Sequence, residues 1–466
     1  MTPALVASRL RVSVRGRLRP VLQDASLELY PGEVVGIRGR SGSGKSVLLH
    51  TVAGLVPWAL GGEVRGELRL GGENLGDLDP TQRAYHLATC LDRPEAQLFL
   101  PTVASEWMAA TRQHRPDPEL ARLVASALGI DRLRDRPIVE LSSGERQRVA
   151  LATVLVAAPR PVLLDEPTSH LDPDGQAGLV EALVAVKAAS GCALVAEHAG
   201  WRLAAAVDRW LELRDGRLRE APPPSEPRLA PPPSSGDGRP VLALASASLQ
   251  RGGRHLLDRA ELRVAAGEVV HVEGSNGVGK SSLARALAGH GLSAGARFHP
   301  GSPALWQPED VALLLPYPDL QLFATTVLAE VRLAGLDACD AGAVLNRFRL
   351  APLAARSPWT LSRGERQRLL LAALEASDAP LLVLDEPAPG LDGEDVAELV
   401  RSIHSRTQRG GAVLMLSNRQ DLAAAAHRRL RLTDAHSSTD HEERRRQGVD
   451  DRGAVRRALG LSLIHI

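Results

Sequence analysis

The chain is poor in features that would place it in a special class of protein. Its 466 residues include three cysteines, which stand far apart, so neither a disulfide framework nor a zinc site is predicted and a reducing cytosol is favoured. No apolar run approaches the roughly 18 residues needed to cross a bilayer, and the N-terminal Met-Thr-Pro-Ala-Leu does not resemble a signal peptide. A net charge of +1 gives no reason to expect nucleic acid as a partner. If the protein works at a membrane, a partner must supply the spanning part.

Lysine is equally scarce, and two of the three lysines close glycine-rich loops. Such a P-loop wraps backbone N–H groups around phosphates, and a slim ammonium reaches the β- and γ-phosphates where a planar guanidinium is too wide. The helix that follows directs its positive end at the same phosphates. Two loops, each behind an apolar run, therefore predict two nucleotide sites. The residues expected around the phosphates are Gly39, Ser41, Gly42, Gly44, Lys45 and Ser46 in the first loop, and Gly274, Asn276, Gly277, Gly279, Lys280 and Ser281 in the second.

The second half of the chain repeats the first. Gly144 matches Gly364 at an offset of 220 residues (364 − 144), and the P-loop lysines are 235 apart (280 − 45). Between the copies lies a proline-rich run at 221–239, which favours an extended linker. We therefore predict a first domain at 1–220, the linker, and a second domain at 240–434.

Each copy alternates apolar runs with helical patterns. Pro161-Val-Leu-Leu-Asp and Leu381-Leu-Val-Leu-Asp are apolar on both faces, as central strands of a parallel sheet are. Runs beginning at Gly191 and Gly411 predict the next strands, and 178–189 and 395–405 suit crossover helices. The predicted fold class is α/β of the P-loop type, present twice.

Three further motifs follow each P-loop in the same order. They are Leu141-Ser-Ser-Gly-Glu-Arg-Gln-Arg148, Val162-Leu-Leu-Asp165-Glu166-Pro and Ser169-His-Leu-Asp172 in the first half, with Leu361–Arg368, Leu382–Pro387 and Pro389–Asp392 in the second. In this order the set resembles the ATP-binding cassette (ABC) family over about residues 5–434. The resemblance implies two nucleotide-binding domains, each with a RecA-like core and a helical subdomain, and Mg²⁺-dependent hydrolysis of ATP.

The carboxylates and hydroxyls suggest distinct roles. Asp165 and Asp385 end strands and are expected to hold Mg²⁺, with a hydroxyl ligand from Ser46 and Ser281. The glutamates that follow the aspartates stand where a carboxylate can polarise an attacking water. We therefore predict Glu166, Glu386 and, from the resemblance, His198 as catalytic residues.

The family resemblance further implies that ATP binds between two cassettes. The first P-loop would then be completed by Ser362 and Gly364, and the second by Ser142 and Gly144. Because both cassettes lie on one chain, the expected arrangement is an intramolecular sandwich.

The two sites are not chemically equal. Where the family has a switch histidine, the first copy has His198 and the second has Asn418, which cannot carry charge. The family's Mg²⁺-sensing glutamine is replaced by Asp92 and by Pro316. We predict a competent first site and a weakened second site, with turnover at both sites as the alternative.

No aromatic residue stands where the family stacks adenine. Arg15 and Arg251 are the nearest candidates, and each could stack through its guanidinium plane. The absence of base stacking is an equal alternative.

The frames Pro94-Glu-Ala-Gln-Leu-Phe99 and Pro318-Asp-Leu-Gln-Leu-Phe323 resemble the ATPases of energy-coupling factor transporters, which import vitamins, cobalt or nickel in prokaryotes. That resemblance implies an integral membrane coupling (T-type) protein and a small substrate-binding membrane protein as partners, at the cytoplasmic face of the cell membrane. The alternatives are another ABC transporter ATPase, of peptide or nickel type, and a soluble tandem-cassette protein acting on ribosomes or DNA.

The tail at 435–466 is polar with mixed charge and is predicted to be disordered. Its end, Leu461–Ile466, resembles a translated sequencing adapter, and a genuine apolar hexapeptide is the alternative. No function is assigned to it.

Overall fold

The computed structural model describes most of the chain. The described residues are 2–15, 19–40, 42–76, 78–91, 96–169, 171–197, 200–225, 229–232, 238–251, 254–274, 278–289, 296–299, 307, 310–316, 318–388, 391 and 393–432. The predicted site residues Ser41, Asp92, His198, Asn276 and Gly277 lie outside them.

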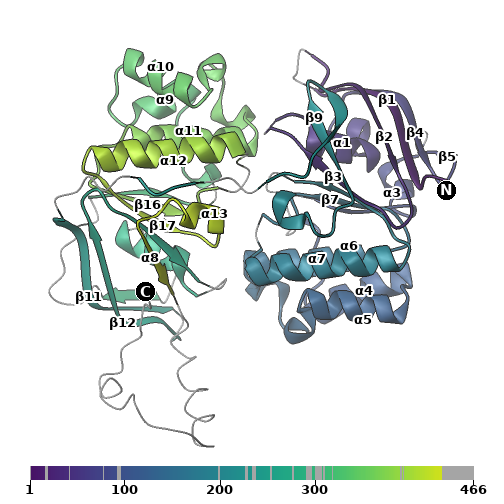
Figure 1. Cartoon of the computed structure of the whole chain (residues 1–466), viewed down its shortest axis with the longest axis horizontal. Coiled ribbons are helices and arrows are strands. Elements are labelled where there is room, and N and C mark those ends of the chain that lie inside the picture. Colours follow the sequence, from purple (N-terminus) through teal and green to yellow (C-terminus); the bar gives the residue numbers. More distant parts are fainter. Residues whose placement is uncertain are drawn as a thin grey trace, which may run out of the picture. The chain divides into compact units, whose positions relative to one another are not determined.

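The chain divides into two compact units, Met1–Glu226 (unit 1) and Pro227–Ile466 (unit 2), so the boundary falls within the proline-rich run (Figure 1). Strand β10 of unit 1 ends at Ala221, and strand β11 of unit 2 begins at Pro240. Among the described residues, no helix is long and apolar enough to cross a membrane.

Unit 1 contains two sheets within its described residues. An antiparallel sheet has the order β2 (Leu22–Leu29), β1 (Leu5–Ser13), β4 (Glu63–Leu70), β5 (Glu73–Asn74). A mainly parallel sheet has the order β10 (Arg217–Ala221), β9 (Arg209–Arg214), β3 (Val34–Arg38), β8 (Ala193–Ala196), β7 (Val162–Asp165), β6 (Ala88–Cys90). The helices are α1 (Lys45–Val52), α2 (Leu55–Trp58), α3 (Pro80–Arg83), α4 (Val103–His114), α5 (Pro118–Ala127), α6 (Ser143–Leu155) and α7 (Pro173–Ala188).

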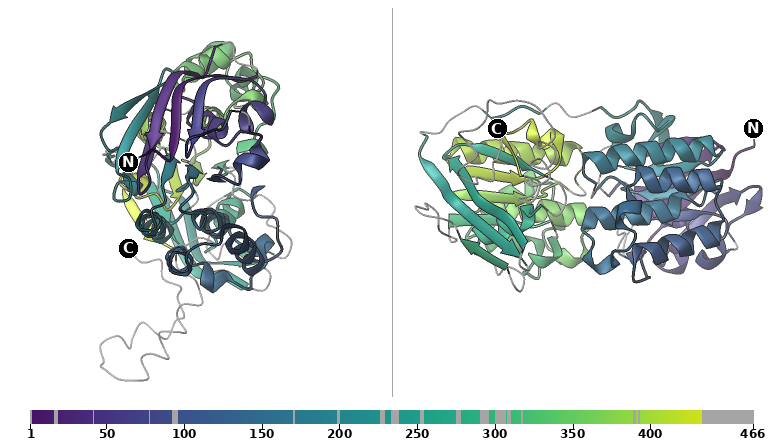
Figure 2. Two further views of the ribbon diagram at one scale, coloured as in Figure 1. Left: turned by 90° about the vertical axis from the view of Figure 1, so that its right-hand side faces the viewer. Right: turned by 90° about the horizontal axis from the view of Figure 1, so that it is seen from below.

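The parallel strands of unit 1 are buried on both faces because a separate core lies on each side. Val34 and Leu164 point into the core shared with α4 to α7, whereas Val35 and Leu163 point into the core shared with α1 and the antiparallel sheet. This alternation follows from the two-residue period of a strand. The helices α4 to α7 lie side by side on the side away from the antiparallel sheet (Figure 2).

Unit 2 repeats this plan, which confirms the predicted α/β class with tandem copies. Its antiparallel sheet has the order β12 (Arg254–Ala265), β11 (Pro240–Arg251), β14 (Ala296–His299), and its parallel sheet β15 (Val311–Leu314), β16 (Leu381–Asp385), β17 (Ala412–Leu416), β13 (Val269–Glu273), β18 (Arg428–Arg431). The helices are α8 (Lys280–Leu287), α9 (Val327–Arg332), α10 (Ala338–Arg347), α11 (Arg363–Glu375), α12 (Gly393–Gln408) and α13 (Gln420–Ala423).

One buried layer differs in chemistry between the units. Where unit 1 has fully buried Leu155, Ala182 and Val186, unit 2 has Glu375, Ser402 and Arg406 at an offset of 220 residues. Ser402 Oγ donates to Glu375 at 2.6 Å, Arg347 pairs with the same carboxylate at 2.5 Å, and Arg406 donates to the carbonyls of Leu374, Ser377 and Ala379. Glu375 and Arg406 line a cavity of about 550 Å³.

Candidate functional site

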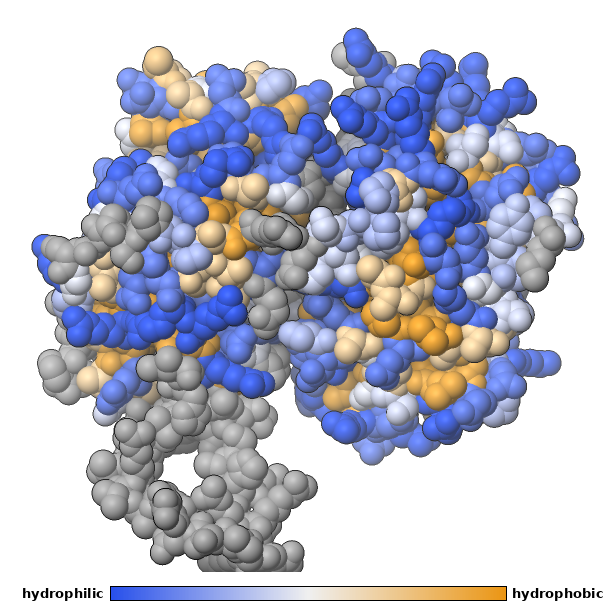
Figure 3. Space-filling model, in the orientation of Figure 1, coloured by the Kyte–Doolittle hydropathy of each residue, from blue (hydrophilic) through white to orange (hydrophobic). Residues whose placement is uncertain are grey.

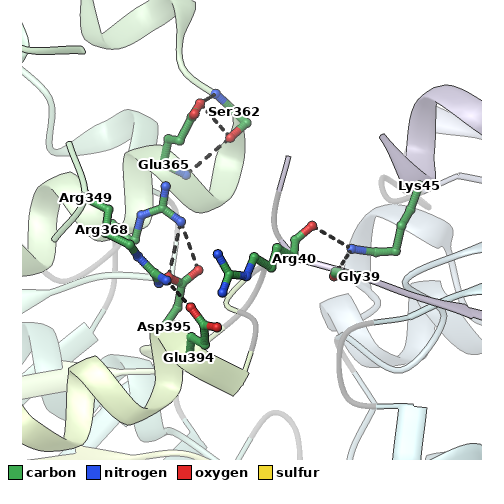
Figure 4. A network of polar contacts seen from close by, with 9 residues as sticks. All are labelled: Gly39, Arg40, Lys45, Arg349, Ser362, Glu365, Arg368, Glu394 and Asp395. Carbon is green, nitrogen blue, oxygen red and sulfur yellow. Dashed lines mark hydrogen bonds and ion pairs between the residues drawn. The ribbon is translucent and has the colours of Figure 1, made fainter. Parts of the chain in front are cut away.

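Both P-loops lead from a central strand into a helix that begins at the loop lysine. Lys45 and Lys280 are only 5% and 7% exposed. Each ammonium folds back on its own loop. Lys45 Nζ donates to the carbonyls of Gly39 (2.8 Å) and Arg40 (3.4 Å) (Figure 4), and Lys280 Nζ donates to the carbonyl of Gly274 (2.5 Å). A buried charge held by carbonyl oxygens is poised to exchange them for phosphate oxygens.

The glycine before each lysine is required by backbone geometry. Gly44 and Gly279 have φ of 108° and 111° at the helix N-cap, a conformation that strains any L side chain. A β-carbon at Gly44 would also lie 2.6 Å from the side chain of Val21. The sequence therefore uses glycine where the chain must turn sharply and expose its N–H groups.

The predicted metal ligands of unit 2 come together. Asp385 at the end of β16 is completely buried, and neither of its carboxylate oxygens has a hydrogen-bond partner among the described residues. Burial raises the pKa of Asp385 to about 7, although the nearby hydroxyl of Ser281, at the start of α8, and the charge of Lys280 act in the opposite direction. A buried carboxylate beside a hydroxyl is an oxygen donor set that fits Mg²⁺, whose charge would favour the ionised acid. In unit 1, α1 carries Ser46 and packs against β7, which ends at the 1% exposed Asp165.

The two predicted catalytic glutamates share an unusual backbone. Glu166 and Glu386 have φ of 49° and 45°, a left-handed conformation that costs non-glycine residues on the order of 1 kcal/mol. Their N–H groups are held by the neighbouring strand, bonding the carbonyls of Ala196 and Leu416 at 2.9 Å. Burial raises the pKa of Glu386, while Lys280 and the Ser417 hydroxyl, which donates to Oε2 at 2.9 Å, favour its anion.

The helices α6 and α11 begin within the motifs Leu141–Arg148 and Leu361–Arg368, and we name them the signature helices. Both begin with the same capping box. Ser142 and Ser362 are N-caps, and each exchanges hydrogen bonds with a glutamate three residues on, Glu145 or Glu365; Figure 4 shows the pair Ser362 and Glu365. Ser142 N donates to Glu145 at 2.7 Å and Ser362 N to Glu365 at 2.8 Å. The role of these glutamates was missed, although the Ser-x-x-Glu spacing announces it. Gly144 and Gly364 lie one residue before them, within the first helical turn.

An arginine of each signature helix is tied to the following helix by a different acid. In unit 1, Arg148 pairs with Asp172, the N-cap of α7, and Gly175 leaves room for the pair because a β-carbon there would lie 2.9 Å from both side chains. In unit 2, Arg368 pairs at 3.0 Å with Asp395, which stands at the Gly175 position (Figure 4). Both pairs fix the orientation of the signature helix.

The glutamines of the Gln-Leu-Phe segments are structural. Gln97 accepts from Leu91 N and donates to the carbonyl of Thr89, both at 2.7 Å, so it bridges the chain that leaves β6. Gln321 does the same for Leu315 N (2.7 Å) and the carbonyl of Leu313 (2.8 Å). Neither the bridge nor its partners could be inferred from the motif alone.

The residue after each buried leucine of these segments is an exposed phenylalanine. Phe99 and Phe323 are 83% and 79% exposed, while buried Glu106 and Glu330 accept hydrogen bonds from their backbone N–H groups. Most of the surface visible in Figure 3 is hydrophilic on both units, and smaller apolar areas lie among the hydrophilic residues. Each braced loop therefore presents an exposed aromatic ring at the surface of its unit.

Within each unit, the P-loop lysine, the strand-end aspartate and the glutamate gather at the carboxyl ends of the parallel strands. The predicted completion of each site by Ser362 and Gly364, or by Ser142 and Gly144, joins the two units and stays a prediction. Of the adenine candidates, Arg15 lies beside Gly61, and the side chain of Arg251 lies outside the described part of the structure.

Comparison with known proteins defines the class. The sequence profile of the ABC transporter family matches residues 22–169 and 257–389, which together span both P-loops and both strand-end carboxylate pairs. The chain therefore belongs to the ABC transporter family and is an ABC ATPase that hydrolyses ATP.

Two relatives match this chain over most of its length. An ABC transporter ATP-binding protein of Treponema denticola, itself provisionally assigned, is 31% identical over 426 residues, covering 84% of this chain and 87% of the relative. A similarly assigned protein of Streptomyces avermitilis is 30% identical over 506 residues, covering 90% of each chain.

Solved structures show the same architecture. A structure described as RNase-L inhibitor matches with a TM-score of 0.64 and 20% identity over 90% of this chain and 87% of that one. A chain from the complex of an archaeal ribosomal stalk protein with an archaeal ribosome recycling factor matches with the same values. At this identity the likeness concerns the fold alone.

Proposed function

We propose that this chain is the ATP-hydrolysing subunit of a membrane transporter, with two cassettes that drive a partner. The proposal rests chiefly on the relatives assigned as ABC transporter ATP-binding proteins, which match along 84% to 90% of the chain. The braced, exposed Phe99 and Phe323 support it, because each unit offers one aromatic anchor at the same point of the fold. Such rings suit apolar pockets of a protein partner.

Each site would bind ATP through its loop and polarise water through its glutamate. The backbone N–H groups and the lysine ammonium hold the phosphates, and Ser281 with Asp385, like Ser46 with Asp165, would hold Mg²⁺. Mg²⁺ supplies neutralisation of phosphate charge. Glu166 and Glu386 orient the attacking water and accept its proton. The signature residues of one unit complete the site of the other in the proposed intramolecular sandwich.

The two sites are proposed to differ in rate. In unit 2 the switch position holds Asn418, whose amide oxygen accepts from Lys280 Nζ at 3.3 Å and Gly274 N at 3.2 Å. Pro316 follows β15, where the family has its Mg²⁺-sensing glutamine, and it offers no side-chain ligand. The first site, with His198 in the sequence, is the competent one.

We further propose the energy-coupling factor subtype, from the resemblance of the two Gln-Leu-Phe frames alone. The relatives compared above carry no transporter subtype in their names, so the comparisons favour the broader alternatives. Import of a vitamin or metal ion, a T-type coupling protein, a small substrate-binding membrane protein and a place at the cytoplasmic face of the membrane all depend on the two Gln-Leu-Phe frames.

A soluble tandem-cassette ATPase is the second candidate. It is favoured by the fold likeness to the RNase-L inhibitor and to the archaeal ribosome recycling factor over 90% of the chain. Against it stands the absence of a net basic charge, since the whole chain carries +1.

Affinity purification of the chain from its host in mild detergent, followed by mass spectrometry, separates these functions. Recovery of a multi-spanning membrane protein supports the transporter ATPase, and an additional small hydrophobic protein supports the energy-coupling factor subtype. Recovery of two large permease subunits points to another ABC transporter. Ribosomal proteins without a membrane protein would replace the proposal with the soluble function.

A further inference from the structure

Three consecutive residues after β17, Ser417–Arg419, bond to several parts of the unit 2 site, and we name them the 418 segment. At its centre, Asn418 Oδ1 accepts from the Gly274 N–H at 3.2 Å and from Lys280 Nζ at 3.3 Å. These two donors begin and end the second P-loop. A P-loop uses such N–H and ammonium groups for phosphate oxygens, so the amide competes with the nucleotide.

Ser417 restrains the glutamate of the same site. Its hydroxyl donates to Glu386 Oε2 at 2.9 Å and is completely buried with β17. Unit 1 has Glu197 at this position (417 − 220), and Glu197 accepts from the N–H and hydroxyl of Thr168 at 3.2 and 2.8 Å. The hydroxyl of Ser417 therefore has no counterpart at this position of unit 1, where the side chain ends in a carboxyl group.

Arg419 anchors the segment from its other end. Its guanidinium forms a bidentate pair with Asp421, whose side chain is fully buried, and donates to the carbonyl of Ala388 at 3.1 Å. A bidentate pair with a buried partner holds a defined geometry. The corresponding residues of unit 1 are Ala199 and Trp201, which cannot form an ion pair.

We propose that the 418 segment is a built-in restraint on the second site, in which Asn418 competes with phosphate oxygens for Lys280 and Gly274 and Ser417 holds Glu386. ATP must displace Asn418 from Lys280 and Gly274 before its phosphates can bind, and Glu386 must leave Ser417 before it can serve the attacking water. The inference rests on the proposed function of unit 2 as an ATP site. It makes Asn418 a determinant of nucleotide affinity and Ser417 a positioning residue for Glu386.

Nucleotide binding to the full chain tests the first part. Lys45→Ala silences the first loop, so a fluorescent ATP analogue and its ADP counterpart, with Mg²⁺, report on unit 2. Adding Asn418→Ala is expected to tighten both about threefold to tenfold, because one competing charge-assisted acceptor is removed. Asn346→Ala, an exposed truncation on α10, is the control and should change neither.

The opposite outcomes are distinct. Weaker binding of the ATP analogue alone would mean that Asn418 contacts the γ-phosphate, and unchanged binding would mean that it does not compete; either overturns the restraint. If the Lys45→Ala chain binds nothing while the unaltered chain binds, the second site is not a nucleotide site and the proposed function of unit 2 fails first.

Single-turnover hydrolysis tests the second part. In the Lys45→Ala chain at saturating ATP, Ser417→Ala is expected to raise the rate severalfold without changing nucleotide affinity, whereas Ser417→Thr, which keeps the hydroxyl, should behave like the parent. A lower rate with Ser417→Ala, or the same rise with Ser417→Thr, would show that the hydroxyl does not restrain Glu386. Equal melting temperatures of the variants guard against a folding effect.

Discussion

Gly36 and Trp210 lie opposite each other on strands β3 and β9, and the indole ring occupies the space that a side chain at Gly36 would need. A β-carbon there would come closer than 3.0 Å to three ring atoms. In unit 2 the matching pair across β13 and β18 is His271 and Arg429. The two copies thus differ at this position, with a buried ring over a glycine in unit 1 and a buried histidine opposite an exposed arginine in unit 2.

Gly36→Ala is expected to destabilise unit 1 by about 1–3 kcal/mol, because the ring must move within a packed core. Urea unfolding followed by tryptophan fluorescence measures it. Trp210→Leu combined with Gly36→Ala should lose less than the sum of the single changes, since the smaller side chain makes room. Full additivity would contradict the proposed clash.

His271 should make unit 2 sensitive to acid. It is 1% exposed, and burial, with Arg429 and Lys280, lowers its pKa from 6.5 to about 4 against the opposing charge of Asp421. Between these two pKa values the unfolded chain binds a proton at His271, whereas the folded chain does not. The contribution of neutral His271 to the free energy of unfolding is therefore complete above pH 6.5 and is lost as the pH falls towards 4, by up to about 3 kcal/mol.

The comparison of His271→Leu with the parent isolates this effect. The difference in unfolding free energy between pH 7 and pH 4.5 should be smaller in the variant. An equal pH dependence would mean that His271 does not titrate as the burial predicts.

The glutamates should contribute unequally to steady-state hydrolysis. Glu166→Gln removes the base of the site with His198 and is expected to lower ATPase activity about 100-fold, whereas Glu386→Gln should lower it only severalfold. Phosphate release at saturating Mg²⁺ and ATP measures both. Equal losses would rule out the proposed asymmetry.

The buried polar side chains of unit 2 should stabilise the fold only when all of them are present. Arg406→Val leaves three carbonyls without their donor and is expected to cost about 3 kcal/mol of unfolding free energy, although unit 1 has valine there. Val186→Ala in unit 1 is the matched cavity-forming change and should cost less, about 1–2 kcal/mol. A neutral Arg406→Val would show that the carbonyls find other partners.

The exposed rings should matter for the partner and not for hydrolysis by the isolated chain. Phe99→Ala and Phe323→Ala together are expected to abolish recovery of the membrane partner while the basal ATPase rate stays within about twofold, because neither ring takes part in the chemistry. Trp58→Ala, which removes another exposed ring in unit 1, is the control. If only Trp58→Ala abolished recovery of the partner, the docking surface would lie around Trp58 and not around the two phenylalanines.

The sequence by itself determined the fold class, the tandem repeat and the motifs of each site. The local backbone requires glycine at a φ of 108°, a lysine at the start of a helix and an acid at the end of a strand. A short motif encodes such local requirements. The capping boxes of α6 and α11 were not predicted, although their Ser-x-x-Glu spacing is present in the sequence.

Only the tertiary structure decided which side chains restrain these motifs. Ser417 reaches Glu386 across 31 residues, Asn418 reaches Lys280 across 138, and Trp210 covers Gly36 on a neighbouring strand. Such contacts depend on how β16, β17, β13 and β9 are ordered in their sheets, which motif spacing leaves undetermined because the connections between the strands vary in length. The sequence therefore identifies the reactive residues of each site, and the packing of the strands determines which neighbouring side chains contact them.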